Sequence, residues 1–337
     1  MGHATRCIPM INALLKANFE PVLASDGDAL LLLQKEFPFL KSIELPSYNI
    51  SYPKNGKNLK FKLFLQLPAI ISAIKKERKI VSQLIEKEHI SGIISDNRFG
   101  VFSKKVPSVY MTHQLKVFSG KTTFITSKIH QKFIKKFDEC WVPDVEGSSN
   151  FSGDLGHLKK HFFNQKYIGI LSRFQPKKFK ITYDLLVLIS GPEPQRTLLE
   201  NKLLVELRNF KGSILMVRGV LNNTTKINAP DNFKIVNYLL ASDLEEAMNQ
   251  SNMVIARSGY STIMDLAVLG KKAFFIPTPG QFEQEYLAKI LQEKLIVPYA
   301  KQGEFTLVKL ENFDKYSGFK KVYSTVDLKL FKLFEGK

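Results

Sequence analysis

The sequence predicts an α/β protein made of two Rossmann-like domains with parallel sheets. Short apolar runs alternate with longer amphipathic runs along the chain, which is the pattern of strands joined by crossover helices. The alternation occurs in two series that meet near residues 165–175. The length of 337 residues suits two domains of ordinary size. We therefore expect one domain over 1–166 and another over 167–337.

The first series accounts for the N-terminal half. An opening helix leads to a strand expected over 21–25, and a long helical region over 63–89 is interrupted by Pro68. Further strands of this half are expected at 92–95, 106–112 and 139–144.

The second series accounts for the C-terminal half. A strand expected over 184–190 is followed by a helix over 193–210. The remaining strands are expected at 213–219, 234–239, 253–259 and 272–278. Ligands of open parallel sheets bind outside the carboxyl ends of the strands, so the turns that follow these strands are where functional residues are expected.

Composition limits the class of protein. A net charge of +18 favours an anionic partner, such as nucleic acid, acidic lipid or a phosphorylated substrate, although a plain lysine-rich surface gives the same total. Cys7 and Cys140 are too few for a disulfide framework or a zinc site, which fits a reducing cytoplasm. No run of about 18 apolar residues is present, so no membrane-spanning helix is expected.

The strongest chemical signal is a turn in the C-terminal half. One strand runs into Ser258 and Gly259, and the next helix opens with Ser261 and Thr262. A helix N-terminus presents free N–H groups and binds phosphate well. Asp265, one turn inside this helix, has a carboxylate that suits the two hydroxyls of a ribose. Serine and threonine also cap helices, so each residue alone is explained as well by capping.

A second turn of the same kind follows directly. After the strand at 272–278, Glu283, Gln284 and Glu285 open another helix. Acid and amide groups bind sugar hydroxyls, although acids also favour the first turn of any helix. Two such turns in succession are harder to explain by capping than either alone.

These two turns resemble the donor-binding half of GT-B glycosyltransferases of the MurG type, in family 28. That family adds N-acetylglucosamine to a lipid-linked peptidoglycan precursor. The stretches RSGYSTIMD, GKKAFFIPTP and FEQEYLA carry the resemblance. It implies that Asp265 replaces a ribose-binding Glu and that Gln284 contacts hydroxyls of the donor sugar. Glu285 stands where the family has a second Gln, which leaves the identity of the sugar open.

The resemblance extends more weakly over the rest of the C-terminal half. YIGILSRFQ implies that Arg173 faces the donor diphosphate, and the stretch around Leu239 would lie near the nucleobase. The family's second glycine loop is ISGPEPQR here, and its two prolines remove N–H donors. We therefore expect Arg196, with the amides of Ser190 and Gly191, to bind the diphosphate.

The N-terminal half resembles the acceptor side of the same family. GHATRCIPM is similar to its first glycine-rich loop and VPSVYMTHQL to its V-I-H-E-Q-N stretch. A histidine suits the general base, and His3 is the first candidate and His113 the second. The acceptor-binding residues expected in the interdomain cleft are Gly2, His3, Asn97, Arg98, His113 and Gln114.

In the resembling family a strand and further glycines precede the Gly-His pair, and this strand is central in the N-terminal sheet. Because the sequence given begins after both, we expect the first strand of the N-terminal domain to be missing. Such a gap leaves backbone groups of two neighbouring strands unpaired. The last helix of the chain is expected to pack back on the N-terminal domain.

The resemblance implies an inverting, metal-independent hexosyl transfer without a cofactor. The best donor is UDP-N-acetylglucosamine, and the acceptor is a lipid-linked or other glycan. A cytoplasmic enzyme lying peripherally on the inner face of the cell membrane fits the charge. The basic end of the helical region, at 75–79, is a candidate for resting on an anionic membrane, with packing on its own sheet as the alternative. The DGD sequence at 26–28 is interpreted as a turn rather than a metal motif.

Two other functions remain open on the sequence. A non-hydrolysing UDP-sugar epimerase shares the predicted fold. A basic nucleic-acid-binding protein fits the charge, but the sequence has no recognisable nucleic-acid module, so no nucleic-acid partner is expected.

Overall fold

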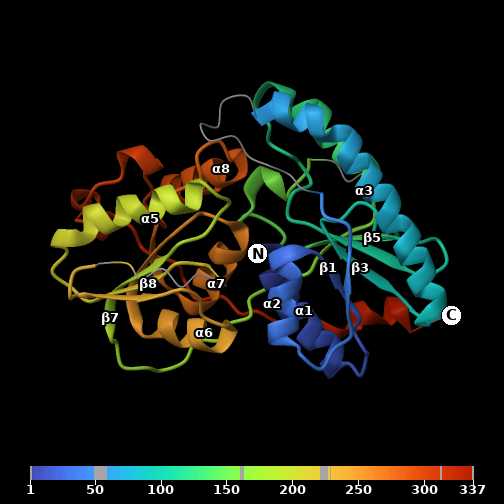
Figure 1. The fold of residues 1–337 in the computed structure, drawn as a ribbon, viewed down its shortest axis with the longest axis horizontal. Coiled ribbons are helices and arrows are strands. Elements are labelled where there is room, and N and C mark those ends of the chain that lie inside the picture. Colours follow the sequence, from blue (N-terminus) through green and yellow to red (C-terminus); the bar gives the residue numbers. More distant parts are fainter. Residues whose placement is uncertain are drawn as a thin grey trace. The chain divides into compact units, whose positions relative to one another are not determined.

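The computed structural model describes residues 2–48, 59–159, 163–220, 227, 229–311 and 313–335. In the helix that begins at Leu59, side chains are described from Pro68 onward. The chain divides into two compact units (Figure 1). Unit 1 comprises Met1–Ser51, Lys60–Leu171 and Ser324–Lys337, and unit 2 comprises Tyr52–Leu59 and Ser172–Tyr323.

Unit 1 alternates helices with short parallel strands. Its α-helices and strands are α1 (Gly2–Lys16), β1 (Leu23–Ser25), α2 (Gly27–Glu36), β2 (Ser42–Glu44), α3 (Leu59–Lys87), β3 (Ile93–Asp96), β4 (Ser108–Met111), α4 (Thr123–Ile134), β5 (Glu139–Val142) and β6 (Gln165–Tyr167). Its 3-10 helices are η1 (Gly120–Thr122), η2 (Gly153–Leu155) and η7 (Leu328–Phe334).

The strands of unit 1 form two separate sheets. β1 pairs in parallel with β2, and β3, β4, β5 and β6 form a parallel sheet in that order. Among the described residues, no hydrogen-bonded strand joins β1 to β3. The expected absence of a first strand stays a prediction. Trp141 of β5 is fully buried, and its ring lies against Phe331 and Phe334 of η7.

Unit 2 is a doubly wound α/β domain. Its α-helices and strands are β7 (Tyr183–Leu188), α5 (Gln195–Glu206), β8 (Ile214–Val217), β9 (Phe233–Val236), α6 (Ala241–Asn249), β10 (Ser251–Ala256), α7 (Tyr260–Leu269), β11 (Lys272–Phe275) and α8 (Phe282–Glu293). Its 3-10 helices are η3 (Leu207–Asn209), η4 (Gln302–Glu304), η5 (Leu307–Leu310) and η6 (Phe313–Lys315).

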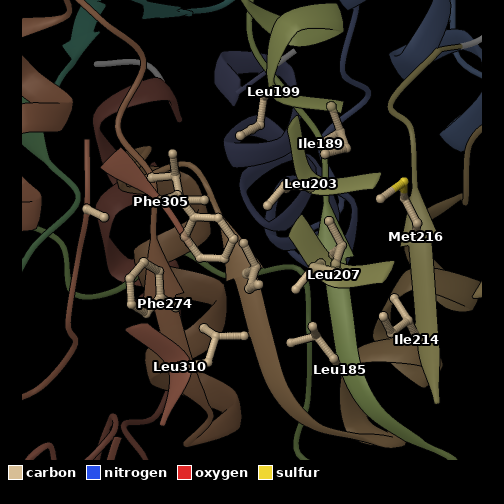
Figure 2. Close-up of a cluster of buried hydrophobic side chains, with 14 of the residues drawn as sticks. Leu185, Ile189, Leu199, Leu203, Leu207, Ile214, Met216, Phe274, Phe305 and Leu310 are labelled. Carbon is tan, nitrogen blue, oxygen red and sulfur yellow. The ribbon is translucent and has the colours of Figure 1, made fainter. Parts of the chain in front are cut away.

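The core of unit 2 lies between its sheet and the helix α5. Side chains alternate between the two faces of a strand, so every second residue of β7 points to the same side. Figure 2 shows Leu199, Leu203 and Leu207 beside Leu185 and Ile189 from this face. Figure 1 shows α5 and α6 on opposite sides of the sheet. This apolar layer makes the strand ends a fixed platform for the turns that follow them.

The strand order places the functional turns of unit 2 next to one another. The sheet runs β11-β10-β7-β8-β9, and every pairing is parallel. The chain leaves β7 toward β8 and later returns to the other side of β7 as β10. In the register, Leu188 of β7 lies opposite Ala256 of β10. The turns after these strands therefore meet at a topological switch point, where α/β sheets bind their ligands.

The predicted fold class is confirmed, with differences in detail. Most of the observed strands are shorter than expected, and in unit 2 the last residues of the apolar runs continue into the turns. Four helices or strands were not predicted, namely α2, β2, α4 and β6. In the part of the chain that the structure describes, no helix is both long and apolar enough to span a membrane.

Candidate functional site

Arg257, which precedes the Ser-Gly turn, ties together the carboxyl ends of three strands. Its buried guanidinium donates hydrogen bonds within 3.5 Å to five oxygen atoms. Burial lowers the pKa of Arg257 to about 9. The acceptors are the carbonyls of Ser190, Gln195, Ile276 and Pro277 and the amide oxygen of Gln302. Sequence reasoning gave this arginine no role, and its contacts show that it builds the platform of the turns.

The Ser-Gly turn opens α7 without a side-chain cap. Gly259 is the N-cap residue, and its helix end has no side-chain capping hydrogen bond. Ser261 and Thr262 lie within the first turn, so capping does not explain either residue. Ser258 is buried and donates from Oγ to the carbonyl of Gln284 at 2.8 Å, which joins this turn to the start of α8.

Asp265, the predicted ribose-binding acid, is buried inside unit 2. Ser172 donates from Oγ to its Oδ1 at 2.6 Å. Its Oδ2 lies 4.0 Å from Nε of Arg173, beyond hydrogen-bond distance. Burial raises the pKa of Asp265 to about 6, although the charge of Arg173 and the bond from Ser172 act in the opposite direction. The sequence pattern did not identify Ser172 as a partner of this acid.

Arg173 is a buried cation whose hydrogen bonds are incomplete. Its side chain is 7% exposed, and its guanidinium lies 4.7 Å from the ring centre of Phe174. Neither Nε nor Nη1 has a hydrogen-bond partner among the described residues. A buried charged donor without a partner is costly, so this guanidinium is arranged to receive an anion. The structure thus brings Arg173 and Asp265, predicted separately, to one place.

The second predicted turn orders the side chains at the start of α8. Gln284 accepts a hydrogen bond from the backbone N–H of Thr278 at 2.8 Å and donates to Gln281 Oε1 at 2.5 Å. Glu285 accepts from the backbone N–H of Gly280 at 3.2 Å. The hydroxyl of Thr278 is buried without a partner among the described residues. Glu283 lies in the same first turn.

The contacts do not support Arg196 as a diphosphate ligand. Its guanidinium is nine-tenths buried and bonded to protein groups, with Nε on Glu193 and Nη1 on Glu200 at 2.9 Å. Glu200 also binds Arg218, so this cluster holds α5 against β8. Ser190 and Gly191 lie exposed at the end of β7, as the switch point requires, whereas Leu239 is half-buried after β9.

In unit 1, the structure brings both candidate bases to one buried ion pair. Arg6 of α1 binds Asp96 at the end of β3, with Nε 3.1 Å from Oδ2 and Nη2 on Oδ1. Nη1 of Arg6 lies 2.6 Å from Nδ1 of His113, and Nη2 lies 3.0 Å from Nδ1 of His3. Nδ1 of His3 is 3.3 Å from Oδ1 of Asp96.

Burial alone would raise the pKa of Asp96, but the charges of Arg6 and His3 hold it well below its usual range. The carboxyl is therefore ionised at every physiological pH. Burial and the charge of Asp96 raise the pKa of the Cys7 thiol, which lies 3.5 Å from the carboxylate. Neither Arg6 nor Asp96 was predicted. Their signal in the sequence is a charged residue inside an apolar helix and another at the end of a buried strand.

Most of the described contacts of the other predicted acceptor residues are with protein groups. Asn97 accepts a hydrogen bond from the hydroxyl of Tyr110 at 2.9 Å. Arg98 donates to Glu77, to Asp26 and to the carbonyl of Pro46, so its contacts give no support for acceptor binding. Gln114 donates its backbone N–H to Thr112, and Gly2 begins α1 beside His3.

The described residues contain no group of three or more His, Cys, Asp or Glu side chains placed to hold a metal ion. In the DGD sequence, Asp26 pairs with Arg98 and Gly27 has φ +51° at the start of α2. The two charged sites are therefore made of arginine, aspartate and histidine.

Comparison with known protein sequences identifies the C-terminal half. Residues 195–313 match the family described as the glycosyltransferase family 28 C-terminal domain. The chain is 24% identical over 207 residues to the UDP-N-acetylglucosamine–N-acetylmuramyl-(pentapeptide) pyrophosphoryl-undecaprenol N-acetylglucosamine transferase of Haemophilus ducreyi, with 59% of this chain and 55% of that protein covered. The transferase of the same name from Methylobacterium sp. is 44% identical over 46 residues, or 14% of this chain and 12% of its own length. The chain thus spans about half the length, or less, of these curated relatives.

Solved structures share the fold over most of the chain. MurG of Acinetobacter baumannii has a TM-score of 0.57 at 13% identity, covering 94% of this chain and 89% of that one. The calicheamicin glycosyltransferase CalG4 has a TM-score of 0.62 at 8% identity, covering 98% and 88%. These findings confirm the predicted pair of Rossmann-like domains and the resemblance to MurG-type enzymes of family 28.

Proposed function

We propose that this chain, whose residues 195–313 form a glycosyltransferase family 28 C-terminal domain, transfers a hexosyl group from a nucleoside diphosphate sugar to a glycan acceptor. The proposed donor is UDP-N-acetylglucosamine, the donor named in the Haemophilus ducreyi relative. The proposed acceptor is lipid-linked, again as in that relative's name. The reaction is a direct displacement that inverts the anomeric carbon.

The observation that carries the proposal is the guanidinium of Arg173, which lies beside Asp265 and has two nitrogens without a hydrogen-bond partner among the described residues. A nucleoside diphosphate supplies what this place lacks, because its phosphate oxygens accept bonds from Nε and Nη1 of the arginine. Its ribose hydroxyls suit Oδ2 of Asp265, which lies 4.0 Å from the side-chain Nε of Arg173. Oδ1 is already held by Ser172, so the acid binds the sugar through one oxygen rather than two.

The chemistry divides between two groups of residues. When the bond between the anomeric carbon and the diphosphate breaks, negative charge develops on the leaving phosphate. Arg173 and the uncapped N-terminus of α7 stabilise this charge in unit 2. In unit 1, His3 is the proposed base for the acceptor hydroxyl, because its side chain is 56% exposed beside the ionised Asp96.

Thermal unfolding with UDP tests the donor site. UDP binds the native state and should raise the melting temperature, as any ligand of the native state does. The variant Arg173→Met should lose this rise, whereas Arg196→Met, which removes an arginine bonded only to protein groups in its described contacts, should keep it. If UDP has no effect on the wild-type protein, or if Arg173→Met keeps the full rise, the donor site is wrong. Mass spectrometry after incubation with UDP-sugars and a lipid extract then identifies the donor and the acceptor.

The exposed face of α4 supports a membrane-bound acceptor. Phe124, Ile125 and Ile129 are 69%, 60% and 52% exposed, although they are large apolar residues. They share one side of the helix with the exposed Lys128 and Lys132. Residues 113–137 contain six lysines and no acidic residue. An apolar face with a lysine fringe fits the interface of an anionic lipid membrane.

This face differs from α3, the helix that the sequence made a candidate for membrane contact. In α3, Ala73, Glu77, Val81 and Ile85 are buried, so much of its length packs inside unit 1. Arg78 lies over the ring of Phe102 at 4.4 Å rather than facing outward alone. These contacts agree with the alternative to membrane contact, in which the helix packs on its own sheet.

Sedimentation with vesicles tests the membrane contact. The protein should bind phosphatidylglycerol vesicles more than phosphatidylcholine vesicles. The triple variant Phe124→Ser, Ile125→Ser and Ile129→Ser should lose most of this binding. Leu198→Ser with Val205→Ser is the matched control, because these exposed residues of α5 lie in unit 2. Equal binding by both variants would contradict the assignment of α4.

A further inference from the structure

We propose that Gln281 selects the donor sugar by donating a hydrogen bond to an oxygen of the hexosyl group, and that Gln284 is a positioning residue that acts through Gln281. The inference rests on the proposed transfer reaction. It departs from the resemblance, which implies that Gln284 itself contacts the sugar and which gives Gln281 no role.

The turn after β11 uses its own backbone N–H groups internally. The two prolines of its IPTPG sequence have no N–H. Thr278 donates its backbone N–H to Oε1 of Gln284 at 2.8 Å. Gly280 donates to Oε1 of Glu285 at 3.2 Å, and Gln281 donates its backbone N–H to the carbonyl of Thr278 at 3.0 Å. A ligand that needs hydrogen-bond donors at this turn therefore finds them on side chains.

The backbone N–H of Thr278 fixes the orientation of the Gln284 amide. A backbone N–H only donates, so the side-chain atom that it contacts must be the carbonyl oxygen Oε1. The amide nitrogen Nε2 then lies on the other branch, where it donates to Oε1 of Gln281 at 2.5 Å. Turning the amide over would place its NH2 group against the N–H of Thr278. Both branches of the Gln284 amide thus contact the turn itself.

The same contact fixes the orientation of the Gln281 amide. Because its Oε1 accepts from Gln284, its Nε2 points away from Gln284 with two N–H groups. Nε2 makes no hydrogen bond to another residue in the part of the chain that the structure describes. Gln281 is half-buried at the N-cap of α8, but its side chain makes no capping bond. It presents donors to an accepting oxygen, such as a hydroxyl oxygen of a hexose or the carbonyl oxygen of an N-acetyl group.

A second polar group of this turn is also unused. Thr278 is 2% exposed, and its hydroxyl has no partner among the described residues. The hydroxyl faces the turn after β7, because a methyl group added at Gly191 would lie 3.5 Å from Oγ1. A buried hydroxyl without a partner is costly, which points to a ligand at these turns. Ser258 joins the start of α8 to the N-terminal turn of α7, where the leaving phosphate is proposed to lie.

Binding measurements with UDP and with UDP-sugars test the role of Gln281. UDP has no hexosyl group, so its affinity reports on the donor site without the sugar contact. In isothermal titration calorimetry, Gln281→Met should lower the affinity for UDP-N-acetylglucosamine by about 3–10-fold, the usual effect of one neutral hydrogen bond, and leave the affinity for UDP unchanged. An equal loss for UDP-glucose assigns the bond to a hydroxyl that both sugars share, and a loss confined to UDP-N-acetylglucosamine assigns it to the acetyl carbonyl. Unchanged affinity for both sugars would overturn the proposal.

The variant Gln284→Glu tests whether Gln284 acts through Gln281. Its carboxylate still accepts the N–H of Thr278, but it now presents an oxygen to Gln281. The amide of Gln281 should then turn over, so that its oxygen and not its NH2 group faces the ligand. Because the added charge acts on UDP and on the UDP-sugar alike, the measured quantity is the ratio of the two affinities. This ratio should fall as far as it does in Gln281→Met.

The double variant Gln281→Met with Gln284→Glu separates positioning from direct contact. Effects of residues that act through one another do not add, so the ratio in the double variant should be no lower than in Gln281→Met alone. If the two losses multiply, Gln284 contacts the sugar itself and its positioning role is wrong. Gln292→Glu is the matched control and should keep the wild-type ratio. Gln292 lies on the same helix and also accepts a backbone N–H, from Tyr299 at 3.3 Å.

The same titrations distinguish failure of this inference from failure of the proposed function. If the wild-type protein binds neither UDP nor a UDP-sugar, the donor site is wrong and this inference fails with it. If UDP binds to the wild type and to Gln281→Met, but the ratio of affinities is the same in both, only the role of Gln281 is rejected. The affinity for UDP and the circular dichroism spectrum show whether each variant keeps a folded donor site.

Discussion

Arg6 of unit 1 and Arg173 of unit 2 are both buried arginines beside an aspartate, but their surroundings differ. The side chain of Arg6 is 1% exposed, and it binds both oxygens of Asp96 as well as His113. Arg173 is 7% exposed and lies 4.0 Å from Asp265. Two of its nitrogens have no hydrogen-bond partner among the described residues.

The pKa values of the two aspartates differ in the same way. Burial raises the pKa of either carboxyl, but only at Asp96 do the neighbouring charges reverse the effect. At Asp265 burial prevails and the pKa is about 6. A closed ion pair is complete before any substrate arrives, which suits a group that must hold a base in one orientation. An open pair is completed only by a ligand, which suits the binding of an anion.

The largest effect is expected for Arg6→Met. Removing one partner of a buried ion pair leaves the other charge unpaired and costs about 3–5 kcal/mol. Urea unfolding followed by the fluorescence of Trp141, the single tryptophan of the chain and a residue of unit 1, should show this loss. The matched variant is Arg173→Met. It should leave the Trp141 transition unchanged and destabilise unit 2 by much less, because it removes a charge that was already poorly paired. Equal losses for the two variants would contradict the comparison.

A second effect comes from the pH dependence of unit 2. The pKa of Asp265 in the folded protein is about 6, against 3.8 for an unperturbed aspartate, a difference of about two. The group therefore contributes stability that is fully present below about pH 4 and is lost as the pH rises through about 6. Two units correspond to about 3 kcal/mol. Asp265→Asn imitates the protonated acid, so it should match the wild type near pH 4 and exceed its stability by up to about 3 kcal/mol at pH 8.

Urea unfolding at several pH values, followed by circular dichroism, measures this difference. Trp141 fluorescence in the same samples serves as the control. Because Trp141 lies in unit 1, its unfolding transition should be the same in the wild type and in Asp265→Asn at each pH. A stability difference that does not change between pH 4 and pH 8 would contradict the pKa of Asp265.

Much of the fold was predictable because its strands are buried on both faces. Runs such as 185–189 and 253–256 are entirely apolar, and alternation with amphipathic runs leaves few arrangements other than parallel sheets. The elements that escaped prediction have a physical reason. β2 and β6 have three residues each, too few to show a period. Asp26 and Gly27 stand at the start of α2, and in the sequence this pair is typical of a turn. In the structure Gly27 has a positive φ, so the helix begins directly from such a turn.

The candidate site was predictable where a role follows from position along one strand or helix. Ser258 and Gly259 were candidates because they follow a strand end directly, and Asp265 because it lies in the helix that begins after them. Partnerships between distant segments were not predictable. Nothing local pairs Arg6 with Asp96, which are 90 residues apart, or Ser172 with Asp265, which are 93 apart. The contacts of Arg196 were not predictable for the same reason, since they depend on the buried Glu200 and Arg218 rather than on the turn that precedes it.

The smallest effect is expected for Ser172→Ala, which sharpens the account of Asp265. The hydrogen bond from Ser172 at 2.6 Å favours the charged carboxylate, so its loss should raise the pKa of Asp265 further. Bonds to charged groups contribute about 1.5–3 kcal/mol, and bonds to neutral groups about 0.5–1.5 kcal/mol. The loss of stability should therefore be larger at pH 8 than at pH 4, and the pH transition of unit 2 should move upward.

The matched control is Ser152→Ala in unit 1. Ser152 donates to Asp144, which is buried like Asp265, but the nearby His157 and the hydrogen bonds from Ser152 outweigh burial and keep the pKa of Asp144 low. Its carboxylate is charged throughout the range above about pH 5, so the destabilisation by Ser152→Ala, read from Trp141, should not change from pH 5 to pH 8. If Ser172→Ala is equally independent of pH, then Asp265 is also charged throughout. The pair of Arg173 and Asp265 in unit 2 would then be a salt bridge like that of Arg6 and Asp96. This result would contradict the difference between the two units.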